Sequence, residues 1–218
     1  MGKKLVLFDF DGTIADTFYP LINVSNKLSK EFGYKKIKSS DISKLRSKHA
    51  YDVLRYLDFP LIKTPFIVKR VRLELSKKIK NFKTVKGIKK WVLELSKNNY
   101  KLGILTTNSN NNVTEFLKRN NLDVFDFVYS GTSIFGKNRM IQRILRIYNL
   151  KPESIIYIGD EIRDIEAAKK ANVDVIAVRW GYNSKKILKK QKPDFFVDKP
   201  EDIIKVLNKI KKTAQFSK

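Results

Sequence analysis

Small polar clusters follow the short apolar segments of this sequence, at the points where buried strands are expected to end. The carboxyl ends of parallel strands meet at one edge of an open sheet, so these side chains should share one crevice. The clusters contain Asp9, Asp11 and Gly12, then Thr107 and Asn108, then Lys137, and finally Asp160, Glu161 and Asp164. Four or five carboxylates would therefore gather beside one lysine.

Carboxylates this close together repel one another and are driven towards protonation unless a cation lies among them. Lys137 supplies one positive charge, and we expect a hard divalent ion with oxygen ligands, Mg²⁺, to supply the rest. A carboxylate held beside Mg²⁺ and a lysine can attack phosphorus and form an aspartyl-phosphate intermediate. The residue types thus predict phosphoryl transfer, which depends mainly on positioning and charge neutralisation.

Apolar runs bounded by polar or turn residues predict the strands that position these clusters. The clearest runs are 5–8, 102–105, 155–158 and 175–178, and 127–129 and 195–197 are weaker candidates. Segments with helical spacing lie between them, near 87–97, 111–120, 141–148, 162–171 and 201–210. Strands that alternate with helices predict an α/β fold with a doubly wound parallel sheet.

Residues 17–83 interrupt this alternation, because they contain only helical spacing. Examples are Leu21, Val24 and Leu28, and the breaks fall at Gly33, Pro60 and Pro65. We therefore expect a catalytic core formed by residues 1–16 and 84–218, and an inserted helical cap domain formed by residues 17–83. A cap hinged near Thr17 and Lys83 could close over the crevice and exclude water.

The clusters resemble, in order and spacing, the four motifs of the haloacid dehalogenase-like hydrolases. The matching segments are Asp9-Phe10-Asp11-Gly12-Thr13, Thr107-Asn108, Lys137 and Gly159-Asp160-Glu161-Ile162-Arg163-Asp164. Residues 11–17, followed by a helical insert, resemble the phosphoglycolate phosphatase-like branch, in which Pro usually follows the lysine where Asn138 stands here. The resemblance covers nearly the whole chain and implies a Rossmann-like core with an inserted cap.

The resemblance also implies a role for each motif residue. Asp9 would be the nucleophile and a metal ligand. Asp11 would protonate the leaving oxygen, activate the hydrolytic water and bind the metal through its carbonyl group, and Gly12 would let the backbone bend towards the phosphate. The remaining residues would hold phosphoryl oxygens (Thr107 and Asn108), bridge Asp9 and the phosphate (Lys137), complete the metal site (Asp160) and orient its ligands or water (Glu161 and Asp164).

The residue types also permit simpler interpretations. Thr107 and Asn108 could cap a helix that starts near Asn110, and Thr106 is a neighbouring candidate on the opposite face of its strand. Lys137 could be an exposed lysine, and Asp164 could stabilise a helix N-terminus. The segment 180–183 either borders the site or forms a packed connection.

Within the predicted cap, Arg46, Lys48 and His49 form a candidate specificity segment for an anionic substrate. The cap segment carries 17 Lys and Arg against 5 Asp and Glu, about twice the density of net positive charge found in the rest of the chain. His49 is the only histidine. Because it lies in the insert, it should not act as a base in the core.

Single residues discriminate among activities on this scaffold. The second aspartate, Asp11, argues against a dehalogenase or a phosphonatase, and the segment 19–23 lacks the His expected in a β-phosphoglucomutase. We therefore expect a Mg²⁺-dependent phosphatase that hydrolyses a small anionic phosphate monoester, such as phosphoglycolate. A nucleotide phosphatase or a pyrophosphatase remains an alternative.

The formal net charge of +24 is also typical of a different functional class, the nucleic-acid-binding proteins. Lysines scattered along the chain argue against such a footprint, so nucleic acid is not the expected partner. The absence of Cys excludes disulfides, thiolate metal sites and a cysteine nucleophile. The first apolar run is too short for a signal peptide or a membrane span, so we expect a cytoplasmic monomer or homodimer without a membrane partner.

Overall fold

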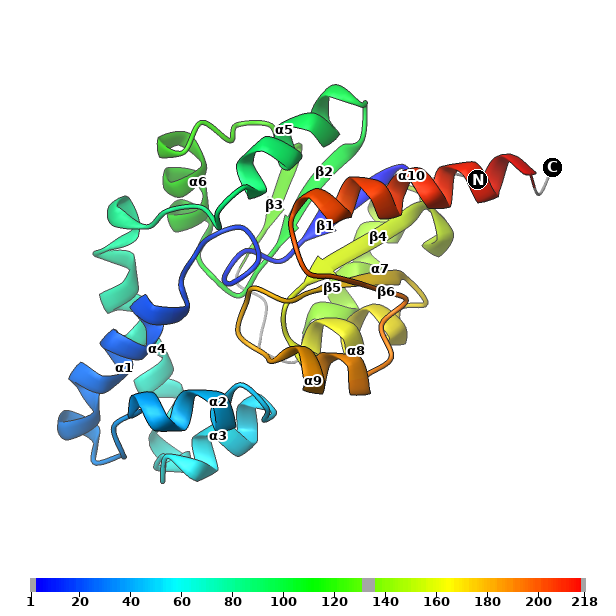
Figure 1. Cartoon of the computed structure of the whole chain (residues 1–218). Helices are drawn as coiled ribbons and strands as arrows, with labels where there is room; N and C mark the ends of the chain where they lie inside the picture. Colours follow the sequence, from blue (N-terminus) through cyan, green and yellow to red (C-terminus); the bar gives the residue numbers. More distant parts are fainter. Residues whose placement is uncertain (1–2, 131–135, 217–218) are drawn as a thin grey trace.

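A six-stranded parallel sheet forms the centre of the computed structural model, which describes residues 3–130 and 136–216. The strand order is β3-β2-β1-β4-β5-β6 (Figure 1). The strands are β1 (Leu5–Phe8), β2 (Lys101–Leu105), β3 (Phe127–Tyr129), β4 (Ile155–Gly159), β5 (Asp174–Val178) and β6 (Phe195–Val197). The predicted doubly wound α/β sheet is confirmed, and both weaker strand candidates belong to it.

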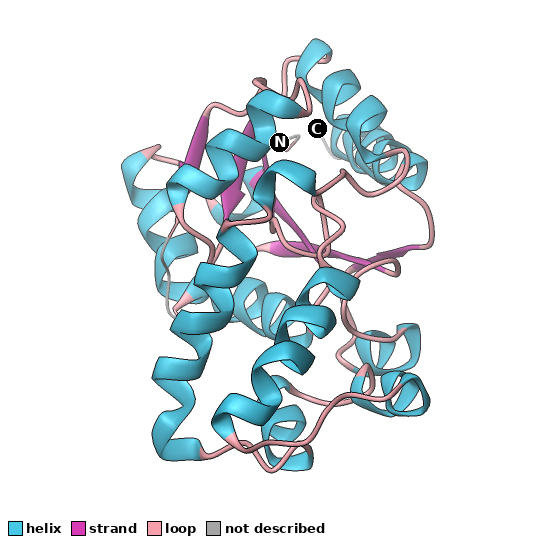
Figure 2. Cartoon of the chain, turned by 90° about the vertical axis from the view of Figure 1, so that its left-hand side faces the viewer, coloured by secondary structure: helices cyan, strands magenta, loops and turns pink. Residues whose placement is uncertain are grey.

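Helices cover both faces of the sheet, as the turned view in Figure 2 shows. One face packs against α5 (Ile88–Lys97), α6 (Asn110–Arg119) and α10 (Glu201–Phe216). The other packs against α7 (Lys137–Ile147), α8 (Ile162–Lys170) and α9 (Lys185–Lys190). Successive strand residues point to opposite faces, so Val6 belongs to the first core and Leu7 to the second.

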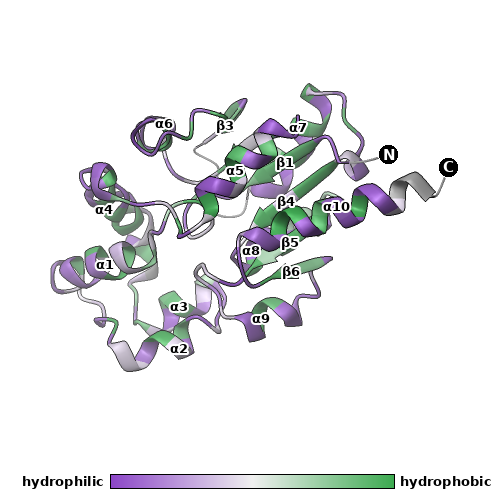
Figure 3. Cartoon of the chain, turned by 45° about the horizontal axis from the view of Figure 1, so that its top comes forward, coloured by the Kyte–Doolittle hydropathy of each residue, from purple (hydrophilic) through white to green (hydrophobic). Residues whose placement is uncertain are grey.

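Burial on both faces explains why the strands are almost entirely apolar. All four residues of β1 and all five of β4 are buried. Figure 3 accordingly colours the central strands as hydrophobic, while the surrounding helices carry hydrophilic stretches. Such continuous apolar runs are typical of parallel strands covered by two helical layers.

Residues 17–83, all of which the structure places, contain helices and no strand. The helices are α1 (Phe18–Phe32), α2 (Ile42–Leu45), α3 (Ala50–Tyr56) and α4 (Thr64–Ser76), with short 3₁₀ turns at 39–41, 61–63 and 79–81. Val24 and Leu28 of α1 pack with Ile67 of α4 in a separate small core. In Figure 1 these helices lie to one side of the sheet, away from both chain termini.

The insert is joined to the core by two adjacent chain segments. The Asp16 N–H donates to the Lys83 carbonyl over 2.9 Å, and Ala15 forms a β-bridge with Thr84. Entry and exit therefore lie side by side, as a hinged insert requires. The division into a core (1–16 and 84–218) and a cap (17–83) stays a proposal on this basis.

The strand order places a topological switch between β1 and β4. From β1 the chain moves outwards to β2 and β3, and it then returns to β4 on the other side of β1. Loops that leave the carboxyl ends of β1 and β4 diverge and open a crevice there, where ligands bind in open α/β sheets. Within residues 3–130 and 136–216, no helix is long and apolar enough to cross a membrane.

Candidate active site

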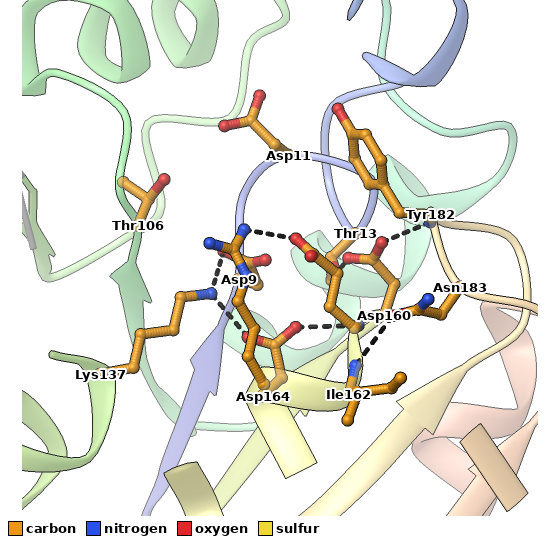
Figure 4. Close-up of polar contacts among 12 residues, drawn as sticks. Asp9, Asp11, Thr13, Thr106, Lys137, Asp160, Ile162, Asp164, Tyr182 and Asn183 are labelled. Atoms are coloured by element: carbon orange, nitrogen blue, oxygen red, sulfur yellow. Dashed lines mark hydrogen bonds and ion pairs between the residues drawn. The ribbon is translucent and has the colours of Figure 1, made fainter. Parts of the chain in front are cut away.

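Three aspartates meet at the carboxyl ends of β1 and β4. Asp9 directly follows β1, Asp160 follows β4, and Asp164 lies in the first turn of α8. One carboxylate oxygen from each lies within 4.8 Å of the other two, and all three residues are buried (Figure 4). The sequence prediction that distant carboxylates share one crevice therefore holds for these residues.

Lys137 is the buried cation of this cluster. Its Nζ lies 2.8 Å from Asp9 Oδ1 and 2.6 Å from Asp164 Oδ1. Burial lowers the pKa of Lys137, but the carboxylates of Asp164 and Asp9 outweigh it and raise the pKa above its usual value. Lys137 is the first residue of α7 and only 2% exposed, so it is not the surface lysine that its sequence context also permitted.

Asp164 is held from three directions. Besides Lys137, Tyr157 donates its hydroxyl proton to Asp164 Oδ1 over 3.2 Å, and the Glu161 N–H donates to Oδ2 over 3.0 Å. The last bond closes the N-terminus of α8, which is the simpler role that the sequence permitted for Asp164. Asp164 thus caps a helix and fixes Lys137 against Asp9 at the same time.

Asp160 is held by hydrogen bonds from the loops that follow β1 and β5. Thr13 donates to Asp160 Oδ1 over 2.6 Å, and the Tyr182 N–H donates to Oδ2 over 2.6 Å. A Cβ atom at Gly12 or Gly181 would collide with the Asp160 carboxylate, and Gly12 also adopts a positive φ of 80°. Gly12 is therefore needed both for its backbone conformation and for the close approach.

The electrostatics of the cluster fit a divalent cation. Burial raises the pKa of Asp9 to about 7, although Lys137 opposes this, and burial together with Asp9 raises the pKa of Asp160 well above its usual value. Among the described residues, Asp9 Oδ2 is buried without a hydrogen-bond partner. The three buried aspartates carry more negative charge than Lys137 can balance, and one of their oxygens has no partner. Carboxylate oxygens are the ligands that Mg²⁺ prefers.

Asp11 stands apart from the three aspartates. In Figure 4 its carboxylate points away from Asp9 and Asp160. Asn108 Nδ2 donates to Asp11 Oδ2 over 3.2 Å. Burial raises the pKa of Asp11, and hydrogen bonds from Asn108 and Thr17 partly offset this. A carboxyl group with a raised pKa is suited to donating a proton.

The structure separates the two threonines that follow β2. Thr106 is 1% exposed and lies beside Asp9 and Lys137 in Figure 4, and its Oγ1 accepts the Asn108 N–H over 3.0 Å. Thr107 is half-buried and lines a cavity towards the insert. Thr106 therefore lies at the strand end near the cluster and Thr107 lies towards the insert, while the role of Thr107 as a phosphoryl ligand stays a prediction.

The sequence profile of the haloacid dehalogenase-like hydrolase family matches residues 6–178. The chain belongs to this family. It is 28% identical to a phosphoglycolate phosphatase from Synechococcus elongatus, covering 95% of this chain and 98% of that one. It is 26% identical to the pyrophosphatase PpaX from Bacillus mycoides, covering 96% and 99%.

The fold matches as well as the sequence does. A haloacid dehalogenase-like hydrolase from Streptococcus pneumoniae superimposes with a TM-score of 0.79 over 94% of this chain and 98% of that chain, at 24% identity. At this identity the superposition establishes the fold.

In the present chain, Glu161 forms an ion pair with Arg163, a motif residue to which the sequence analysis gave no role. Its Oε1 accepts a hydrogen bond from Arg163 Nη2. Burial lowers the pKa of Arg163, but Glu161, Asp164 and Asp9 together raise it, so the guanidinium stays charged beside the cluster. Glu161 thus orients a cation, and its predicted contact with metal ligands or water stays a prediction.

The predicted specificity segment is docked onto the core loop that follows β5. Arg46 donates to the carbonyls of Gly181 and Tyr182 over 2.7 and 3.1 Å. Asn183 accepts the Ile162 N–H and donates to the carbonyls of Arg46 and Lys48, which ties the insert to the start of α8. The segment 180–183 therefore borders the site.

The other two residues of that segment have different surroundings. Lys48 Nζ lies 5.9 Å from the centre of the Tyr56 ring, and His49 is exposed just before α3. Substrate selection by Arg46, Lys48 and His49 stays a prediction. Sequence reasoning gave no role to Tyr157, which lies inside the apolar run 155–158, and no individual role to Thr13 of the first motif or Asn183 of the segment 180–183.

Proposed function

We propose that this protein is a Mg²⁺-dependent phosphatase that hydrolyses small phosphate monoesters through a phosphorylated Asp9. The observation that carries the proposal is the buried cluster in which Lys137 bridges Asp9 and Asp164, with Asp160 close enough to share a cation with them. A relative named phosphoglycolate phosphatase supports phosphoglycolate as the first substrate to test.

In the first half-reaction Asp9 attacks phosphorus, so that a bond forms between the carboxylate oxygen and phosphorus while the ester P–O bond breaks. Asp11 gives its proton to the leaving oxygen. Lys137, Thr106 and the Asn108 segment hold the oxygens of the transferring group, with Thr106 replacing Thr107 in this role. A Mg²⁺ held by Asp9, Asp160 and the Asp11 carbonyl group would neutralise the charge of the phosphoryl oxygens.

In the second half-reaction Asp11 acts as a base. It takes a proton from water, the water oxygen attacks phosphorus, and the bond to Asp9 breaks, which releases inorganic phosphate and restores both carboxyl groups. The raised pKa of Asp11 suits it to carry the proton in both directions.

Pyrophosphate is a second candidate substrate, because a relative of similar identity and coverage is named a pyrophosphatase. The same machinery would serve, since the leaving group would then be a second phosphate instead of an alcohol.

A panel of phosphoglycolate, sugar phosphates, nucleotides and pyrophosphate, assayed with and without Mg²⁺, tests the proposal. We expect turnover of at least one member, loss of turnover on chelation, and loss of nearly all activity in Asp9→Asn. Turnover that survives this substitution or ignores chelation would refute the mechanism.

A further inference from the structure

A cavity of about 500 Å³ lies between α4 of the insert and the core segment that leads into α6. In Figure 1 both elements lie on the same side of the molecule. Thr107, Asn108 and Asn112 line it from the core, and Phe66, Lys69 and Arg72 are among the residues that line it from α4. None of its lining residues is acidic.

A hydrogen-bonded chain connects this cavity to the reaction centre. Asn112 Nδ2 donates to Ser76 Oγ over 2.6 Å and to Asn108 Oδ1 over 2.9 Å, and Asn108 Nδ2 in turn donates to Asp11. In the proposed mechanism Asp11 protonates the leaving oxygen. A leaving group that takes the proton of Asp11 would therefore lie close to Asn108, which lines the cavity.

Of the three cations that line the cavity, Arg70 lies near a carboxylate but, among the described residues, Lys69 and Arg72 do not. Arg70 lies 3.5 Å from Glu74, which also accepts from Lys77. Lys69 and Arg72 are exposed, and no ion pair joins either of them to another residue within the described part of the chain. Two such cations beside one cavity favour an anionic group there.

The same wall also carries apolar surface. Phe66, Lys69, Leu73 and Ser76 follow one another at helical spacing on the face of α4 that does not pack against α1. The Phe66 side chain is 71% exposed and Leu73 is 50% exposed, and Phe32 of α1 adds a second ring to the lining. A flat apolar group would cover this surface and gain from aromatic contact.

The volume of the cavity is larger than a small leaving group requires. Glycolate or a second phosphate has only a few heavy atoms, whereas cavities of about 300–1,000 Å³ are typical of ligands several times larger. We infer that the α4 cavity receives a leaving group that carries both a ring and an anionic group, recognised by Phe66 and by Lys69 with Arg72. This inference rests on the proposed function, and it deepens it by naming the class of phosphate ester.

Three phosphate esters separate the two features of the leaving group. 4-Carboxyphenyl phosphate carries a ring and an anion, phenyl phosphate carries only the ring, and phosphoglycolate carries only the anion. We expect the wild-type protein to show a higher kcat/KM for 4-carboxyphenyl phosphate than for either of the others. Equal values for the two aryl esters would overturn the inference.

Variants assign the preference to the cavity. In the double variant Lys69→Gln/Arg72→Gln, the ratio of kcat/KM for 4-carboxyphenyl phosphate over phenyl phosphate should fall at least tenfold. In Phe66→Ser the ratio of phenyl phosphate over phosphoglycolate should fall several-fold. The control Lys186→Gln/Lys190→Gln removes the same charge from exposed positions of α9 and should keep both ratios. If the control and the cavity variant behave alike, the cavity does not recognise the anion.

Binding provides a readout that does not depend on turnover. Calorimetry with the Asp9→Asn variant and Mg²⁺ should show tighter binding of 4-carboxyphenyl phosphate than of phenyl phosphate, and the difference should disappear when Lys69→Gln/Arg72→Gln is added. If phosphate esters are hydrolysed through Asp9 but these preferences are missing, the inference fails while the proposed function stands. Turnover by Asp9→Asn would instead reject the proposed function.

Discussion

The burial of the Asp9 carboxyl group links the chemistry of the site to the stability of the protein. Asp9 has a pKa of about 7 in the folded protein, against an ordinary value of 3.8. Between these values the folded state binds more protons than the unfolded state, so the free energy of unfolding must decrease as the pH rises. Asp160 acts in the same direction, because its pKa is also raised.

We therefore expect the melting temperature of the metal-free protein to fall between pH 5 and pH 8, and the stabilisation by added Mg²⁺ to grow over the same range as metal binding displaces protons. Thermal melts at several pH values, with and without Mg²⁺, measure both effects. Asp9→Asn should flatten the metal-free dependence. A wild-type melting temperature that rises with pH in the absence of metal would contradict the assignment of these carboxyl groups.

The two threonines after β2 allow a matched comparison at the residue scale. Thr106→Val removes a buried hydroxyl beside Asp9 and Lys137, and we expect kcat/KM for phosphoglycolate to fall by roughly 10- to 100-fold, the value of a hydrogen bond to a charged group. Thr107→Val should change it by no more than about threefold, because Thr107 faces the cavity. Steady-state kinetics of both variants measure this difference. A larger loss in Thr107→Val than in Thr106→Val would support Thr107 as the phosphoryl ligand.

At the scale of elements, the loop after β5 connects three parts of the protein. Tyr182 holds Asp160, Asn183 holds the start of α8, and the same loop accepts the hydrogen bonds of Arg46 from the insert. Ser184 adds a backbone bond from its N–H to the Arg46 carbonyl over 2.7 Å. The position of the insert and the geometry of Asp160, a proposed metal ligand, are thus connected through one short segment.

Asn183→Ala tests this connection. It leaves the buried Ile162 N–H without its acceptor and removes two donors to the insert, so we expect Mg²⁺ to bind roughly fivefold more weakly or worse, equivalent to about 1 kcal/mol. Calorimetry measures the affinity, and hydrogen exchange should become faster at residues 46–49 and 160–163. Asn98→Ala, which removes two exposed hydrogen bonds to Glu94 at the C-terminus of α5, serves as the control. Unchanged affinity in Asn183→Ala would show that the loop does not position the metal ligands.

At the scale of the whole molecule, the net charge of +24 gives the surface a strongly positive potential. Half of this net charge lies in the insert, whose helix α4 lines the cavity beside Asn108. Long-range attraction of this kind accelerates encounter and weakens as salt screens it.

We expect kcat/KM for an anionic ester to fall several-fold between about 20 and 300 mM salt, while kcat at saturating substrate and Mg²⁺ stays nearly constant. Melting temperatures recorded in the same buffers exclude salt-induced unfolding as the cause. If kcat/KM does not depend on salt, the basic surface has no part in substrate capture.

Local patterns in the sequence were sufficient for the strand and helix layout. Parallel strands buried on both faces must be continuous apolar runs, and β1, β4 and β5 stand out for this reason even without relatives. The polar residues that follow these runs are also local features. Since a doubly wound sheet brings its strand ends to one edge, the meeting of Asp9 and Asp160 could be foreseen from the chain alone.

Other features depended on the packing of distant segments. Thr106 lies near the aspartate cluster while Thr107 lines the cavity, and Arg46 bonds to residues 181 and 182 because the insert folds back onto the core. The cavity of α4 exists only where residues 66–76 meet residues 107–112. Sequence periodicity specifies which face of an element is apolar and which residues end a strand. It does not specify which distant segment covers that face, because this is settled by the balance of packing and hydrogen bonding across the whole chain.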